Sequence, residues 1–306
     1  MIKNLFFLLM SFVLLASSGK VLAMSSTNYL IQWDSVNTGG VDQSTSTNFS
    51  LYDTVGDNSS GTSSSGNYEL SAGYRAPESA NTLSYQIRSV SAVVNTSYTA
   101  FNNAADTVTV SSVVGFANGD LIAVVENTGF SQLVSVGRIT QIVGNVISVD
   151  DFDGDDVAMS AIPAGGDDLV YKLDSNSVNF GTISSGNQYT SVVGTSVLSS
   201  VASGYSLYIS ADQILQNAGA QVISSVIDGA VTIGFEEYGA EVTGSSAFSP
   251  GVDLAVTTTQ RIIQTSGAST GPISDKIPMI YKLSVTSSTN SGVYSQNVYY
   301  TLTANY

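Results

Sequence analysis

The sequence of 306 residues contains no cysteine and no histidine. Without cysteine, no disulfide can stabilise the chain, so its stability must come from core burial, bound ions or assembly. Without histidine, Ser-His-Asp and Cys-His catalytic sites and zinc sites with histidine ligands are excluded. Because these absences remove the usual general base of hydrolytic enzymes, we predict that the protein is not an enzyme and uses no cofactor, apart from the Ca²⁺ considered below.

Positively charged residues are also scarce, since nine Lys and Arg stand against 24 Asp and Glu and the formal net charge is −15 at pH 7. A chain of this charge is repelled by phosphate backbones, so we predict no nucleic-acid partner. Charged residues of both signs make up only 11% of the chain. Ser, Thr, Asn, Gly and Val are abundant instead, a mixture that favours strands and turns over helices.

Long apolar runs are absent beyond the start of the chain, so we predict no transmembrane helix in the mature protein. The one such run, Leu5 to Ala16, follows Lys3 and precedes the small-residue sequence Val21-Leu22-Ala23. This order is typical of a secretory signal and its cleavage site, and the run is shorter than the roughly 20 residues that span a bilayer. We predict that residues 1–23 are a signal peptide and that the protein is secreted or displayed on the cell surface; a retained membrane anchor is the alternative.

A repeat follows the predicted signal peptide. It places Asn before an aromatic residue at Asn28-Tyr29, Asn48-Phe49 and Asn67-Tyr68. Each copy predicts a strand and a turn that bury the aromatic side chain against neighbouring copies, although an aromatic platform for a glycan is the alternative. We assign residues 24–75 to a β repeat segment and residues 76–82 to a linker, because Pro77 interrupts the strand pattern.

The series S-x-N-Y-x-L, G-G, S-x-N-F-x-L, T-V-G, S-x-N-Y-x-L, G-Y resembles a segment that follows the signal peptide in uncharacterised secreted and cell-surface proteins of bacteria. Those proteins are similar in carrying β-sandwich modules further along the chain, with no assigned enzyme activity. The first copy departs from the series, because Leu30 follows Tyr29 directly, and Phe49 replaces the middle tyrosine. The resemblance implies an extracellular β-protein and specifies no chemistry.

Short strands separated by turns continue from residue 83 to residue 174. The continuous apolar run Leu121–Val125 follows a turn, and Gly144-Asn145 joins the strands Arg138–Val143 and Val146–Val149 as a tight hairpin connection. Such a series predicts a middle β-domain over residues 83–174, built as a small β-barrel or sandwich.

An acidic cluster, residues 150–156, lies within this middle region. Carboxylates at Asp151, Asp153 and Asp155 match the start of an EF-hand loop, but Gly154 stands at the fourth position and Ile162 where a bidentate Glu is required. The loop is therefore not an EF-hand. A looser Ca²⁺ site with Asp151, Asp153 and Asp155 as ligands is one hypothesis, because hard oxygen ligands suit this ion, and a solvated acidic loop is the other.

The last segment, residues 175–306, ends in two strands of alternating apolar and polar residues. Tyr281, Leu283 and Val285 predict a half-buried strand with Lys282 and Ser284 on the wet face. The turn residues 287–292 and the alternation from residue 298 to residue 306 then predict a closing hairpin, whose last strand buries Tyr294, Val298, Tyr300, Leu302 and Tyr306.

This segment resembles immunoglobulin-like surface and pilus-type β-sandwiches of bacteria in its opening V-N-F-G-T-I, its strand S-G-Y-S-L-Y-I and its ending G-V-Y-S-Q-N-V-Y-Y-T-L-T. The resemblance implies a structural or adhesive module and brings no catalytic residues. The predicted fold is thus all-β, with an N-terminal β repeat segment, a small β-barrel or sandwich, and a C-terminal immunoglobulin-like β-sandwich.

Three functions are compatible with these features. We favour a non-enzymatic secreted or cell-surface protein with a structural or adhesive role, including that of a subunit in an extracellular assembly, whose partners are other surface proteins, copies of itself or glycans. A carbohydrate-binding or carbohydrate-active protein is the second hypothesis, because glycosidases need only paired carboxylates; the candidates are Asp228, Glu236, Glu237 and Glu241. An outer-membrane β-barrel is the third, because the final alternating strand ends in Tyr306.

Overall fold

The computed structural model describes residues 81–164 and 166–305, together with six strands in the first 80 residues. The chain divides into two compact units, residues 1–80 and residues 81–306. The predicted signal peptide and most of the predicted linker lie outside the described residues. In the first unit three antiparallel pairs are described: β1 (Ser25–Ser26) with β2 (Tyr29–Leu30), β3 (Gly39–Thr45) with β4 (Ser50–Val55), and β5 (Gly61–Ser64) with β6 (Glu69–Ala72).

The second unit begins with six strands whose pairings close into a ring. In the order of pairing they run β7, β8, β11, β10, β9 and β13, and β13 returns to β7. The predicted tight hairpin at Gly144-Asn145 is confirmed, because it joins β10 to β11. The bounds are β7 (Leu83–Asn102), β8 (Thr107–Val110), β9 (Leu121–Glu126), β10 (Leu133–Val143), β11 (Val146–Val149), β12 (Asp153–Gly154) and β13 (Leu169–Ser175), with a 3₁₀ turn at Asn103–Ala105.

Strand β9 is buried on both faces, which explains its continuous apolar sequence. Ile122 and Val124 lie in the core inside the ring, with Phe101, Phe152 and other ring residues. Leu121 and Ala123 belong to a second cluster that includes side chains of the C-terminal strands, among them Ile280. The outer face of the ring at β9 is therefore covered by the rest of the unit.

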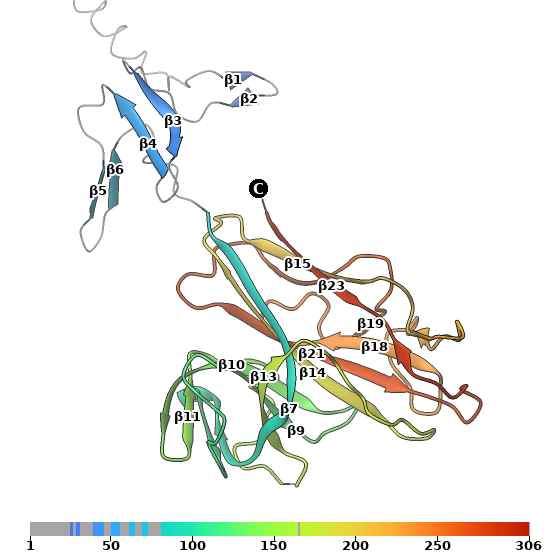
Figure 1. Ribbon diagram of the computed structural model, residues 1–306. Helices are drawn as coiled ribbons and strands as arrows, with labels where there is room; N and C mark the ends of the chain where they lie inside the picture. Colours follow the sequence, from blue (N-terminus) through green and yellow to red (C-terminus); the bar gives the residue numbers. More distant parts are fainter. Residues whose placement is uncertain are drawn as a thin grey trace, which may run out of the picture. The chain divides into compact units, whose positions relative to one another are not determined.

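The remaining strands form a two-layered sandwich (Figure 1). One layer continues the large sheet in the order β7, β14, β21, β18, β17, and the other is the three-stranded sheet β20, β15, β23. Their facing side chains, including Leu207, Ile277 and Tyr281, share the largest core. The bounds are β14 (Tyr189–Ser199), β15 (Tyr205–Ala211), β16 (Gln216–Asn217), β17 (Ser224–Ser225), β18 (Glu237–Val242), β19 (Asp253–Leu254), β20 (Arg261–Ser266), β21 (Asp275–Ser284), β22 (Tyr294–Ser295) and β23 (Val298–Ala304).

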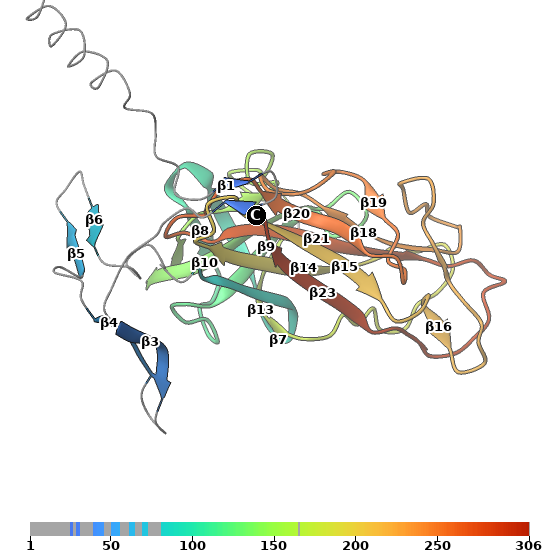
Figure 2. The same ribbon diagram turned by 90° about the horizontal axis from the view of Figure 1, so that it is seen from above.

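The predicted all-β fold class is confirmed, since the described residues contain strands and one 3₁₀ turn but no α-helix. The long strand β7 joins the segments that we expected as separate domains, because it pairs with β13 through residues 89–97 and with β14 through residues 83–89 (Figure 2). Within the described parts of the chain, no helix has the length and apolar character required to cross a membrane.

The predicted closing hairpin is wrong. Strands β21 and β23 lie in different sheets, since β21 pairs with β14 and β18 whereas β23 pairs with β15. The predicted wet face of β21 is also wrong, because Lys282 and Ser284 are buried. The physical reason is that β21 packs on the ring with one face and on the three-stranded sheet with the other.

Candidate functional site

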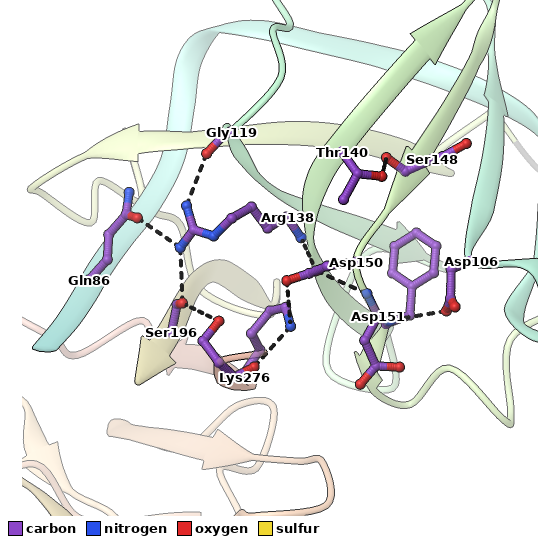
Figure 3. A network of polar contacts seen from close by, with 12 residues as sticks. Gln86, Asp106, Gly119, Arg138, Thr140, Ser148, Asp150, Asp151, Ser196 and Lys276 are labelled. Carbon is purple, nitrogen blue, oxygen red and sulfur yellow. Dashed lines mark hydrogen bonds and ion pairs between the residues drawn. The ribbon is translucent and has the colours of Figure 1, made fainter. Parts of the chain in front are cut away.

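The acidic cluster lies where the ring meets the sandwich, and its first carboxylate holds the two together. Asp150 Oδ1 accepts hydrogen bonds from the backbone N–H of Arg138 (3.0 Å) and of Asp151 (2.9 Å). Asp150 Oδ2 forms an ion pair at 3.2 Å with Nζ of Lys276, a β21 residue whose side chain is 1% exposed (Figure 3). Lys276 Nζ also donates to the carbonyl of Ser274 at 2.9 Å. A buried ammonium group is thereby neutralised at the junction.

The side chain of Arg138 extends the same network from β10 to the sandwich. Its guanidinium donates to Gln86 Oε1 on β7 (3.0 Å), to Ser196 Oγ on β14 (2.9 Å) and to the carbonyl of Gly119 (2.9 Å), as Figure 3 shows. Ser196 Oγ in turn donates to Ser274 Oγ at 2.8 Å. Charge-assisted hydrogen bonds from Arg138 thus tie β10 to two strands of the large sheet, β7 and β14.

The three predicted calcium ligands point to different partners. Asp153 is buried, and its Oδ1 and Oδ2 accept hydrogen bonds from the N–H (2.7 Å) and Oγ–H (2.6 Å) of Ser245, far along the chain. Asp155 Oδ2 accepts from the backbone N–H of Val134 at 3.0 Å, whereas Asp151 is exposed. Among the residues that the structure describes, no group of three or more acidic side chains is arranged to hold a metal ion. The geometry assigns Asp153 and Asp155 to holding the loop in place.

Gly154 is required for this placement of the loop. Its φ is +135°, and a Cβ atom there would lie 2.3 Å from the carbonyl oxygen of Val134, a backbone atom that cannot move aside.

Burial raises the pKa of both Asp151 and Asp155. A carboxyl whose pKa is higher in the folded state stabilises that state most at low pH, so ionisation of these two groups opposes folding.

Calcium binding by Asp151, Asp153 and Asp155 stays a hypothesis, and the geometry sets its condition: an ion would have to displace Ser245 from Asp153. We therefore expect the midpoint of thermal unfolding to be the same in excess Ca²⁺ as in the presence of a chelator. A midpoint that rose with Ca²⁺ in the native protein and in Asp174→Asn, an exposed control, but not in Asp151→Asn would contradict this expectation and identify a ligand.

The carboxylates proposed for glycoside hydrolysis bind separate partners. Glu236 Oε2 accepts from Thr289 Oγ1 (2.6 Å), Glu237 Oε2 from the N–H of Thr232 (2.8 Å), and Asp228 Oδ1 from the N–H of Ala230 (3.2 Å). Glu241 is brought beside a carboxylate that the sequence did not single out, Asp253, because both bind Nζ of Lys282. The signal was Lys282 itself, because a charged residue in a mainly apolar strand requires a counter-charge when it is buried.

A cavity of about 1480 Å³ lies at one end of the sandwich. Its walls come from β7, from the extended segment 175–185, from β21 and from residues 285–300. The lining contains tyrosines, aliphatic side chains and many Ser, Thr, Asn and Gln, and its only charged residue is Arg88. No pattern in the sequence indicated this cavity, because its walls are separate segments that only the tertiary fold brings together.

A cluster of tyrosines forms the floor of the cavity. The rings of Tyr238 and Tyr281 stack with centroids 6.0 Å apart, Phe180 meets Tyr238 edge-on, and the hydroxyls of Tyr281 and Tyr300 are hydrogen-bonded at 2.7 Å. Gln296 Nε2 donates to the hydroxyl of Tyr238 at 3.1 Å. Burial raises the pKa of the Tyr238, Tyr281 and Tyr300 hydroxyls, so all three stay neutral at physiological pH.

The cavity is therefore equipped for binding through aromatic surfaces and neutral hydrogen-bonding groups rather than for proton transfer. Comparisons of the chain with protein-family models, curated proteins and solved structures found no match. What the protein does must accordingly be inferred from its own residues.

Proposed function

We propose that the protein is a non-enzymatic component of the cell exterior, secreted or surface-bound, with a structural and adhesive role. The observation that carries this proposal is the lining of the cavity, which has no Asp, Glu, Lys, His or Cys. A hollow of this size without an acid, a base or a nucleophile of suitable pKa can bind a ligand but has no evident means of transforming it. The predicted signal peptide supports export.

The chemistry of the lining favours an uncharged ligand. In a protein with a formal net charge of −15, a cavity with no carboxylate is set apart from the rest of the chain. Tyr85, which is 52% exposed, offers a ring at the surface of the cavity, and Asn176 and Asn179 add amide donors and acceptors beside it. Aromatic faces with amide groups suit the apolar faces and hydroxyls of neutral sugars, so we propose a neutral glycan as the ligand to which the module adheres.

Binding and hydrolysis of neutral oligosaccharides would be measured together. We expect binding without release of any sugar, and we expect Tyr85→Ala to weaken it about tenfold, a ratio that corresponds to ~1.4 kcal/mol. Phe235→Ala is the matched control, because Phe235 is 60% exposed but does not line the cavity. Hydrolysis that disappears in Glu241→Gln would contradict the proposal and favour a carbohydrate-active enzyme, whereas equal losses in both aromatic variants would place binding outside the cavity.

A further inference from the structure

The three-stranded sheet has an open edge at β23. In the described part of the chain, β23 pairs with β15 along its whole length and with no other strand. The hydrogen bonds that flank this pairing, from Asn305 N–H to the Gly204 carbonyl and from Asp212 N–H to the Asn297 carbonyl, are both 3.0 Å long.

These two bonds fix which backbone groups are free, because hydrogen-bonded pairs alternate along an antiparallel ladder. Residues 299, 301 and 303 face β15, like residues 297 and 305. The N–H and C=O groups of Val298, Tyr300, Leu302 and Ala304 therefore point away from the sheet.

The β23 edge also lacks the features that usually protect an edge strand. Its sequence, residues 298–304, has no charged residue and no proline, and its register against β15 is unbroken. The opposite edge of the same sheet is covered, since Phe248 N–H bonds to the Ile263 carbonyl and Thr265 N–H to the Ser246 carbonyl of a neighbouring loop, both at 2.9 Å. One edge is closed by the chain itself and the other is left available.

We propose that β23 pairs antiparallel with β23 of a second copy of this chain, about a twofold axis that passes beside Thr301. The outward residues are symmetric about Thr301, so Val298 of one copy lies opposite Ala304 of the other, and Tyr300 opposite Leu302. All four free N–H and C=O pairs of each strand are satisfied in this register, and the two sheets join into one of six strands. The interface is isologous, as in most soluble homodimers.

The exposed side chains of β23 fit this register. Thr301 lies opposite its own copy, and Tyr299 opposite Thr303, all on the outer face of the sheet. Thr–Thr and aromatic–Thr neighbours across an antiparallel pair are favourable, and no like charges face each other along the strand. A second copy is the occupant that this edge specifies, because the free positions are complementary to themselves. The inference rests on the proposed structural role and gives it a partner.

Crosslinking tests the register directly, since a protein without cysteine offers a clean background. Thr301→Cys would place two thiols in a pair that is not hydrogen-bonded across the new interface, with Cα atoms about 4.5 Å apart, within the roughly 4.4–6.8 Å that a disulfide spans. We expect a mild oxidant, which takes up the protons and electrons of the two thiols, to link most of the Thr301→Cys chains into dimers. Thr303→Cys is the matched control, because its thiols would be displaced by about 13 Å along the strands and should not be linked.

A second variant tests the pairing without a crosslink. Ala304→Pro removes an N–H that points outward and leaves the ladder to β15 intact, so the chain should stay folded but sediment as a monomer where the native chain sediments as a dimer. Sedimentation would be carried out at physiological ionic strength, where the Debye length is about 8 Å, because the net negative charge of each copy opposes association at low salt.

The outcomes separate this inference from the proposed function. Equal crosslinking of Thr301→Cys and Thr303→Cys, or none in either, would overturn the β23 pairing. Oligomers in sedimentation without a Thr301→Cys crosslink would also overturn it, and would place assembly on another surface while leaving the structural role standing. If the protein bound glycan but was monomeric at every concentration, the adhesive role would be supported and the structural role through self-assembly would not.

Discussion

A chain truncated after Ser291 is expected to lose its folded sandwich. The truncation removes β22 and β23, and with them one of the three strands of the sheet β20, β15, β23. Val298, Tyr300 and Leu302 pack on the main core, and Tyr300 also bonds to Tyr281. Loss of one large buried aromatic side chain costs about 3–5 kcal/mol, against a usual total stability of roughly 5–15 kcal/mol. Sedimentation and limited proteolysis of the truncated and full chains would measure the loss.

The matched control for the truncation is Tyr299→Ala. Tyr299 is on the same strand but on its outer face, 54% exposed, and its removal should leave the protein folded and resistant to proteases. The truncated chain should instead expose the edge of β15, which can pair with other chains and aggregate. If the truncated chain stayed monomeric, soluble and protease-resistant, β23 would be peripheral to the core.

What the sequence could predict of the fold is clearest at β21 and β23. The alternation from residue 298 to residue 306 predicted a strand with one buried face, and β23 alternates accordingly between half-buried and exposed residues, while Tyr306 lies outside the described residues. The alternation of β21 predicted a strand equally well, but not its neighbours. Period-two patterns fix which residues share a face, whereas pairing depends on packing between segments distant in the chain, such as Tyr281 against Tyr300.

The acidic cluster is a second case in which the sequence pattern did not identify partners that are distant in the chain. The spacing of Asp151, Asp153 and Asp155 suggested a common ligand, because carboxylates close together in sequence are often close in space. The structure gives Asp153 a partner 92 residues away, Ser245, and gives Asp150 a partner in Lys276 on β21. A local pattern can identify buried carboxylates but cannot identify the groups that neutralise them.

Replacement of Lys282, a buried cation, is expected to lower the stability of the fold strongly. Its Nζ lies 2.5 Å from Glu241 Oε2 and 3.0 Å from Asp253 Oδ1, and the side chains of Lys282 and Asp253 are 9% and 6% exposed. Burial alone would lower the pKa of Lys282, but the hydrogen bonds and charges of Glu241 and Asp253 outweigh it and raise the pKa. The charged lysine therefore stabilises the fold at all pH values below its unfolded pKa, and this contribution is lost only as the pH rises through the raised folded pKa.

Lys282→Met should lower the free energy of unfolding at pH 7 by about 3–5 kcal/mol, because it leaves two partly desolvated carboxylates without a counter-ion. The deficit should shrink at neutral pH when Glu241→Gln and Asp253→Asn are added, and it should also shrink as the pH rises through the raised folded pKa of Lys282. Urea unfolding at several pH values would measure both effects. The control is Lys172→Met, whose ion pair with Asp120 at 2.8 Å is about one-fifth exposed on each side and should contribute at most about 1 kcal/mol. Equal losses in the two lysine variants, or a Lys282→Met deficit that Glu241→Gln and Asp253→Asn did not change, would contradict the assignment of Lys282 as the counter-ion of this pair.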